Sequence, residues 1–219
     1  MKASPQHRPP PAQKATLSGP YGAFRQNNAL KAIIFVWLIL AAMLTLLSLI
    51  APLFVAPEIT ESRDHYLGIT LRAVAMAGIL AQILCLPFYC WWVNRTCKNA
   101  WLLNPPKMKT TPARAVGYYF IPVVSIWKPY VSMCEMRQAS YGMSTKLKSL
   151  LAYWWFFWLA YMLLTACNLV SQFSFHDELI TMRDKLSMIA GITAIVVNYL
   201  TAAVVLSMTN AQNRQAAQW

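Results

Sequence analysis

Four long stretches of the chain are apolar and contain no Asp, Glu, Lys or Arg. They predict transmembrane helices over residues 32–57, 73–94, 149–175 and 186–210, each bracketed by ionisable residues. A helix needs about 20 apolar residues to cross the hydrocarbon core of a bilayer. A buried helix of a soluble protein seldom stays uncharged on every face for so long. The predicted fold class is therefore an all-α membrane protein with four transmembrane helices.

The polar ends of the chain complete the predicted domain organisation. Residues 1–30 are rich in Pro, Gln and Ser and lack hydrophobic periodicity, which predicts a disordered tail. Residues 31–213 form the predicted membrane domain, and residues 214–219 form a short C-terminal tail. Within the first tail, Pro9-Pro10-Pro11 is a candidate docking segment for a protein partner.

A helical subdomain is predicted between the second and third transmembrane helices. Its apolar run from Ala115 to Trp127 is only about 13 residues, too short to span a bilayer. The pattern predicts interfacial elements over about 113–127 and 129–141, joined at Trp127-Lys128-Pro129-Tyr130, because Pro129 suits the first turn of a helix. The first element is re-entrant or lies on the membrane surface, and the sequence leaves both open.

The distribution of Lys and Arg predicts the orientation in the membrane. Both tails and the 95–148 loop carry 15 of the 19 basic residues, and the other two loops carry four. Basic loops stay in the cytoplasm, so both termini and the subdomain are predicted to be cytoplasmic. Anionic lipid on the cytoplasmic side attracts these basic residues, which explains the net charge of +12. No zinc-finger spacing or RNA-binding signature accompanies the basic residues, so a nucleic-acid partner is not predicted.

Several ordered motifs between about residues 80 and 164 carry a family resemblance. They are Trp92-x-x-Arg95-x-x-x-Asn99, Pro112-x-x-Ala115-Val116-Gly117-Tyr118-Tyr119-Phe120-Ile121-Pro122, Trp127-Lys128-Pro129-Tyr130, Glu135, Ala139-Ser140 and Tyr153-Trp154-Trp155-x-x-Trp158. Together they resemble the bacterial membrane protein family catalogued as domain of unknown function 4328. At Arg137-Gln138 this chain departs from the family, which more often has Trp then Arg, so no basic role is carried over to position 138. The resemblance implies a multi-pass protein of the bacterial inner (cytoplasmic) membrane and implies no activity.

The subdomain also holds the candidate functional residues. They form a predicted polar core or lipid-binding set of Arg95, Asn99, Trp127, Lys128, Pro129, Tyr130 and Glu135. Glu135 is the only acid in its loop, so a cationic partner for it is expected among Arg95, Lys128 and Arg137. In the spans, Gln82 and Asn198 lie at similar predicted depths and are candidates for a hydrogen bond across helices. No catalytic residue, metal site or cofactor is predicted, because no known catalytic or metal-binding motif occurs.

Three functions remain open at this point. The leading interpretation is a non-enzymatic module that binds membrane lipid, including anionic lipid, or a partner protein through the basic and aromatic subdomain. The alternative is a small transporter or channel-like protein, although proton-coupled transport usually needs a charged residue near the midplane. The third is an enzyme acting on a lipid-linked substrate, with Glu135 as its acid or base.

Overall fold

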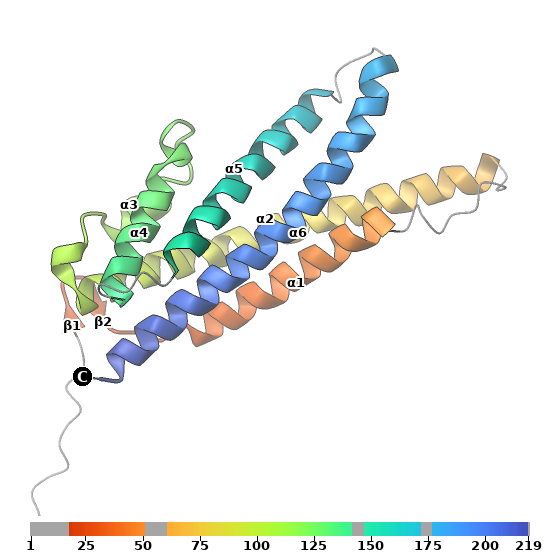
Figure 1. Ribbon diagram of the computed structural model, residues 1–219. Helices are drawn as coiled ribbons and strands as arrows, with labels where there is room; N and C mark the ends of the chain where they lie inside the picture. Colours follow the sequence, from red (N-terminus) through yellow and green to blue (C-terminus); the bar gives the residue numbers. More distant parts are fainter. Residues whose placement is uncertain (1–17, 51–60, 142–146, 172–176, 219) are drawn as a thin grey trace, which may run out of the picture.

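The computed structural model describes residues 18–50, 61–141, 147–171 and 177–218 of the 219-residue chain (Figure 1). Four long helices dominate it: α1 (Asn28–Ile50), α2 (Glu61–Leu103), α5 (Lys148–Ser171) and α6 (Asp177–Ala216). Between α2 and α5 lie η2 (Pro105–Lys107), α3 (Pro112–Gly117), η3 (Val124–Ile126) and α4 (Lys128–Tyr141). Two short strands, β1 (Ser18–Gly19) and β2 (Gly22–Ala23), form an antiparallel hairpin ahead of α1.

The structure contains four helices that could cross a membrane, as the sequence predicts. Helices long and apolar enough to cross a membrane occupy Asn28–Ile50, Met76–Leu103, Lys148–Ser171 and Lys185–Ala216. The exposed side chains on their outer faces are large and apolar, for example Val36 (66% exposed), Ile83 (57%) and Leu163 (66%). In water such faces would be costly, whereas lipid tails are a matching solvent for them.

Two of these helices are much longer than the apolar runs that predicted them. The 43-residue α2 continues past residue 94 to Leu103, and the 40-residue α6 continues past residue 210 to Ala216, into the predicted C-terminal tail. A charged residue ends an apolar segment but does not end a helix, because its backbone hydrogen bonds can continue outside the membrane. The first predicted helix is also shifted, since α1 begins at Asn28, and residues 51–57 of that prediction lie outside the described part of the chain.

The long helices are paired. In Figure 1, α1 runs beside α2 and α6, and α5 runs beside α6. The indole Nε1 of Trp154 in α5 donates to Thr201 Oγ1 in α6 over 3.0 Å. Gly191 lets α6 approach α1 closely, because a Cβ at this position would lie 3.1 Å from Leu49 Cδ2. Small residues at such crossings allow backbones to pack in lipid, where no hydrophobic force drives helices together.

The N-terminal segment (residues 18–28), the 104–112 loop and the last turns of α6 lie together at one end of the bundle (Figure 1). We call it the basic end, because it carries Arg25, Arg95, Lys107 and Arg214. Asn213 Nδ2 in α6 donates to Asn28 Oδ1 in α1 over 3.0 Å, which places both ends of the described chain on the same side.

Part of the predicted disordered tail has a defined position. Residues 18–30 were included in that tail because they lack periodicity, but residues 18–23 form the hairpin and residues 28–30 begin α1. The Tyr21 ring meets Trp101 of α2 edge-on, with ring centroids 5.6 Å apart. Contacts with a distant helix therefore hold this segment, and local periodicity carries no signal of them. Residues 1–17, including Pro9-Pro10-Pro11, lie outside the described part.

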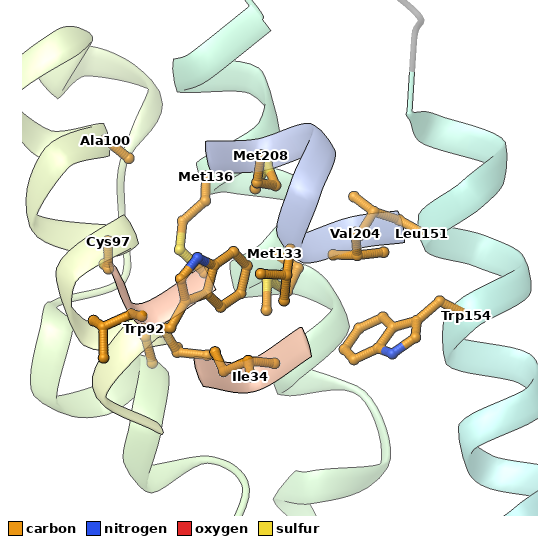
Figure 2. Close-up of a cluster of buried hydrophobic side chains, with 14 of the residues drawn as sticks. Ile34, Trp92, Cys97, Ala100, Met133, Met136, Leu151, Trp154, Val204 and Met208 are labelled. Carbon is orange, nitrogen blue, oxygen red and sulfur yellow. The ribbon is translucent and has the colours of Figure 1, made fainter. Parts of the chain in front are cut away.

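The subdomain packs against the helices near the basic end. Of the predicted element 113–127, only α3 and η3 are helical, and α4 matches the predicted element 129–141 closely. The buried core here draws on all the long helices and α4, as Figure 2 shows for Ile34, Trp92, Met133, Trp154 and Met208. The most tightly packed part of the protein thus includes the subdomain, which fixes the orientation of α4 relative to the spans.

Candidate functional site

A buried amide joins three helices at the basic end. The side chain of Gln212 in α6 is 1% exposed. Its Nε2 donates to the Thr96 carbonyl of α2 over 2.9 Å and to Ser140 Oγ of α4 over 3.1 Å. Its Oε1 accepts from Asn99 Nδ2 over 3.2 Å. Because buried polar groups are costly unless paired, this network fixes α2, α4 and α6 in one arrangement.

Asn99 extends the network to the N-terminal segment. Its Nδ2 also donates to the Arg25 carbonyl over 2.9 Å, and its Oδ1 accepts from the Arg25 N–H over 3.3 Å. One turn earlier, Thr96 Oγ1 accepts from Asn27 Nδ2 over 3.1 Å, and Arg95 Nη2 donates to the Gln26 carbonyl over 3.0 Å. The segment is thereby held on the outside of α2.

Two predicted site residues, Arg95 and Asn99, belong to this network. Sequence reasoning missed Asn27, Thr96 and Gln212, since Asn27 fell in the predicted tail and Gln212 lay beyond the predicted end of the fourth helix. Polar side chains just outside an apolar run were the available signal. This sequence signal does not tell which of the polar side chains are buried.

The predicted Trp127-Lys128-Pro129-Tyr130 elbow lies at the start of α4, beside α5. The Tyr130 ring stacks on Trp155 with centroids 6.4 Å apart, and Trp155 stacks on Trp158 at 4.8 Å. Burial raises the pKa of Tyr130 above its ordinary value. Trp127 is 46% exposed, Lys128 is half-buried and Pro129 is buried. The elbow therefore offers one aromatic and one cationic side chain to its surroundings.

Glu135 has backbone partners in the structure. Its Oε2 accepts from the N–H of Lys109 over 3.0 Å and of Thr110 over 2.8 Å. The Thr110 carbonyl in turn accepts from Trp101 Nε1 over 2.9 Å. Consecutive N–H groups of a loop can converge in this way on one carboxylate oxygen, a kind of partner that the sequence analysis did not consider for Glu135. Glu135 thus holds the 109–110 backbone against α4 through Oε2.

Replacing Glu135 by alanine should lower the free energy of unfolding by about 1–2 kcal/mol, because the partly buried N–H of Thr110 and the exposed N–H of Lys109 lose their acceptor. Glu135→Gln should cost less, since the amide Oε1 can still accept one of them. Thermal unfolding in a mild detergent measures both changes. Equal losses for the two variants would show that the charge, rather than the acceptor, matters at this position.

The predicted site residues do not form one cluster. Arg95 and Asn99 lie with the N-terminal segment, Glu135 lies in the middle of α4 against the 109–110 backbone, and Trp127–Tyr130 lie at the start of α4. Lys128 and Glu135 are separated by about 10 Å along the helix axis, given a rise of 1.5 Å per residue. The chain therefore presents two separate surfaces, one at the elbow and one at Arg95.

Within the spans, the predicted pairing of Gln82 with Asn198 does not occur. Gln82 Oε1 accepts from the Tyr161 hydroxyl over 3.1 Å, and the buried Nδ2 of Asn198 has no hydrogen-bond partner. In the described part of the chain, no three His, Cys, Asp or Glu side chains come together as a metal site.

One comparison with known proteins gives a result. A family model described as domain of unknown function (DUF4328) matches residues 68–210. That match covers α2 from its second turn to the last turns of α6 and includes the whole subdomain. No curated protein and no solved structure matches the chain.

Proposed function

Since this chain belongs to the family described as domain of unknown function (DUF4328), we propose its function from its own geometry. In this proposal, the protein is a non-enzymatic module of the bacterial inner membrane that binds anionic lipid of the cytoplasmic leaflet through its subdomain. The basic end faces the cytoplasm, because basic segments flank membrane helices on that side. Both termini are then cytoplasmic.

The observation that carries this proposal is an exposed apolar tip, residues 120–127. Its exposed apolar side chains are Phe120 (60%), Ile121 (49%), Val123 (66%), Ile126 (52%) and Trp127 (46%). An exposed patch of this kind marks a membrane or protein contact. The tip is continuous along the chain with the half-buried Lys128, which gives it a cationic base.

The depth of the tip favours lipid as what it contacts. The carbonyl of Ile126 accepts from Trp155 Nε1 over 3.0 Å. Trp155 lies about 10 Å along α5 from its start at Lys148, in a segment apolar enough to span. The hydroxyl of Tyr119, the residue directly before the tip, lies 3.3 Å from the hydroxyl of Tyr89 in α2. If α5 and α2 cross the bilayer, the tip enters one leaflet, which favours the re-entrant over the surface-lying interpretation.

Lys128 is suited to bind phosphate from this depth. A lysine side chain can bury its methylene stem along apolar surface and extend its ammonium to the headgroups. Trp127 places an indole, which is apolar with one N–H, at the same boundary. The pair would anchor the tip and favour anionic over zwitterionic lipid.

Lys128→Ala should reduce the preference of the protein for phosphatidylglycerol over phosphatidylcholine about fivefold, equivalent to ~1 kcal/mol. Native mass spectrometry of the protein released from nanodiscs of each lipid measures the retained molecules. Lys107→Ala, which removes an exposed lysine of η2, is the matched control and should keep the preference. Equal retention of both lipids by wild type would contradict the proposal, and the tip would then be an anchor without selectivity.

A transporter is the second candidate, favoured by one observation. The unpartnered Nδ2 of Asn198 is a buried donor in a span, and such donors in membranes commonly line a path or pair with a partner. The Gln82–Tyr161 hydrogen bond lies in the same set of helices. A liposome flux assay separates this candidate from lipid binding, because a lipid-binding module carries no solute.

A further inference from the structure

Arg95 has a guanidinium group that the protein only partly satisfies. Arginine has five N–H donors and no acceptor. Nη2 donates to the Gln26 carbonyl over 3.0 Å, while the buried Nε has no hydrogen-bond partner. Arg95 is also the first charged residue after the apolar run of α2, so it lies where a spanning helix reaches the lipid headgroups. It offers charge and hydrogen-bond donors at that level.

A second arginine is held beside it. The N–H and carbonyl of Arg25 both hydrogen-bond to the side chain of Asn99, which lies one turn after Arg95 on α2. The exposed Arg25 side chain therefore starts next to Arg95, close enough for the two positive charges to repel each other. Like charges are kept together at a cost unless an anion lies near both.

In the described part of the chain, neither arginine has an acidic partner. Glu135 is the only acid between residues 65 and 176, and residues 1–57 and 185–219 contain none. Its Oε2 is hydrogen-bonded to the backbone N–H groups of Lys109 and Thr110. An anion from outside the protein would fit the arginine pair, and a phosphate oxygen is the acceptor that arginine binds best.

The surface of α2 below the pair is apolar and exposed. Trp91 (55% exposed), Leu84 (52%) and Leu80 (54%) lie 4, 11 and 15 residues before Arg95, spacings that put all four on one helix face. The stripe runs from the spanning part of α2 up to the two arginines. A phospholipid has this same layout, with acyl chains below a phosphate. A free phosphate has no apolar part that could contact the stripe.

We infer that Arg25 and Arg95 together bind the phosphate of an anionic phospholipid, with its glycerol region against Trp91 and an acyl chain along Leu84 and Leu80. The inference rests on the proposed function in so far as both place the basic end among lipid headgroups. It adds a defined site on α2 and makes the N-terminal segment a part of it. The site is separate from the tip, because Trp91 lies about 200° around α2 from Tyr89, which meets the subdomain at Tyr119.

The test measures phosphatidylglycerol binding to the full chain by native mass spectrometry after titration of the lipid in detergent. Arg25→Gln and Arg95→Gln should each weaken the tightest binding step about fivefold, and the double variant about thirtyfold, if each charge contributes as a lysine or arginine near anionic lipid does. Arg114→Gln, at an exposed arginine of α3, is the matched control and should change it little. Because Arg95 also holds Gln26, Arg25→Gln keeps the test valid if Arg95→Gln fails to fold.

Three outcomes would overturn the inference. One is unchanged binding in Arg25→Gln and the double variant. Another is an equal loss in Arg114→Gln, which would mean that general charge is responsible. The third is displacement of the lipid by inorganic phosphate at millimolar concentration, which would assign the pair to a free phosphate. If Lys128→Ala weakens phosphatidylglycerol binding but neither arginine variant does, only this inference is contradicted. If the wild-type protein retains phosphatidylglycerol and phosphatidylcholine equally, the proposed function itself is contradicted.

Discussion

Replacing Gln212 by leucine should lower the free energy of unfolding by about 3 kcal/mol. The substitution keeps the size of the side chain but removes both its donors and its acceptor. The Thr96 carbonyl, Ser140 Oγ and Asn99 Nδ2 would each lose a hydrogen bond in a buried place. Losing a hydrogen bond costs about 0.5–1.5 kcal/mol, and the three losses occur in one network, so they do not add fully. Thermal unfolding followed by circular dichroism in one detergent measures the change.

Asn213→Leu is the matched control for Gln212→Leu. Asn213 is the next residue of α6, and its Nδ2 makes an exposed hydrogen bond to Asn28. Its loss should change the free energy of unfolding by less than about 0.5 kcal/mol, as exposed substitutions usually do. If both variants unfold at the same temperature, the network around Gln212 does not stabilise the fold, and the position of Arg25 beside Arg95 would need another explanation.

Replacing Trp155 by alanine should lower the free energy of unfolding by about 3–5 kcal/mol, the usual cost of removing a buried tryptophan. Trp155 is 7% exposed and stacks between Tyr130 and Trp158. Its Nε1 also holds the tip through the Ile126 carbonyl. The tip should therefore loosen first, so limited proteolysis in detergent should cut within residues 118–127 at lower protease concentration than in wild type.

Two variants separate the contributions of Trp155. Trp155→Phe keeps an aromatic ring but loses the bond to Ile126, so it should cost about 1 kcal/mol for the hydrogen bond, plus some packing. Phe156→Ala removes a neighbouring aromatic ring that is 65% exposed on α5 and should leave the tip protected. Unchanged proteolysis of the tip in Trp155→Ala would show that contacts other than Trp155 hold it.

These variants also affect lipid binding in different ways. Gln212 supports Asn99, which holds Arg25, so Gln212→Leu should weaken the arginine pair without touching the tip. Trp155→Ala should weaken anchoring through Trp127 and Lys128 without touching Arg95. The two surfaces can therefore be tested independently in one protein.

The sequence alone determined the family and the number of helices that are long and apolar enough to span a membrane. Crossing a bilayer is a requirement on each segment by itself, because every residue of the span must tolerate lipid, and this leaves a long uncharged run that can be counted. The start of α4 at Lys128-Pro129 was also predictable, because proline favours the first turn of a helix whatever surrounds it. Arg95 and Asn99 could be recognised from the sequence as polar residues that follow an apolar run, whereas their hydrogen-bond partners could not.

Only the tertiary structure decided how far α2 and α6 extend and which polar groups meet. Asn27, Thr96, Asn99 and Gln212 come from three distant parts of the chain, and their hydrogen bonds depend on how α1, α2 and α6 pack. Glu135 likewise found backbone N–H groups some 25 residues away, where sequence reasoning offered it only basic side chains. Transfer into lipid is a property of a single segment and can be summed along the sequence, whereas a hydrogen bond between helices depends on the direction and distance of two groups, which packing alone sets.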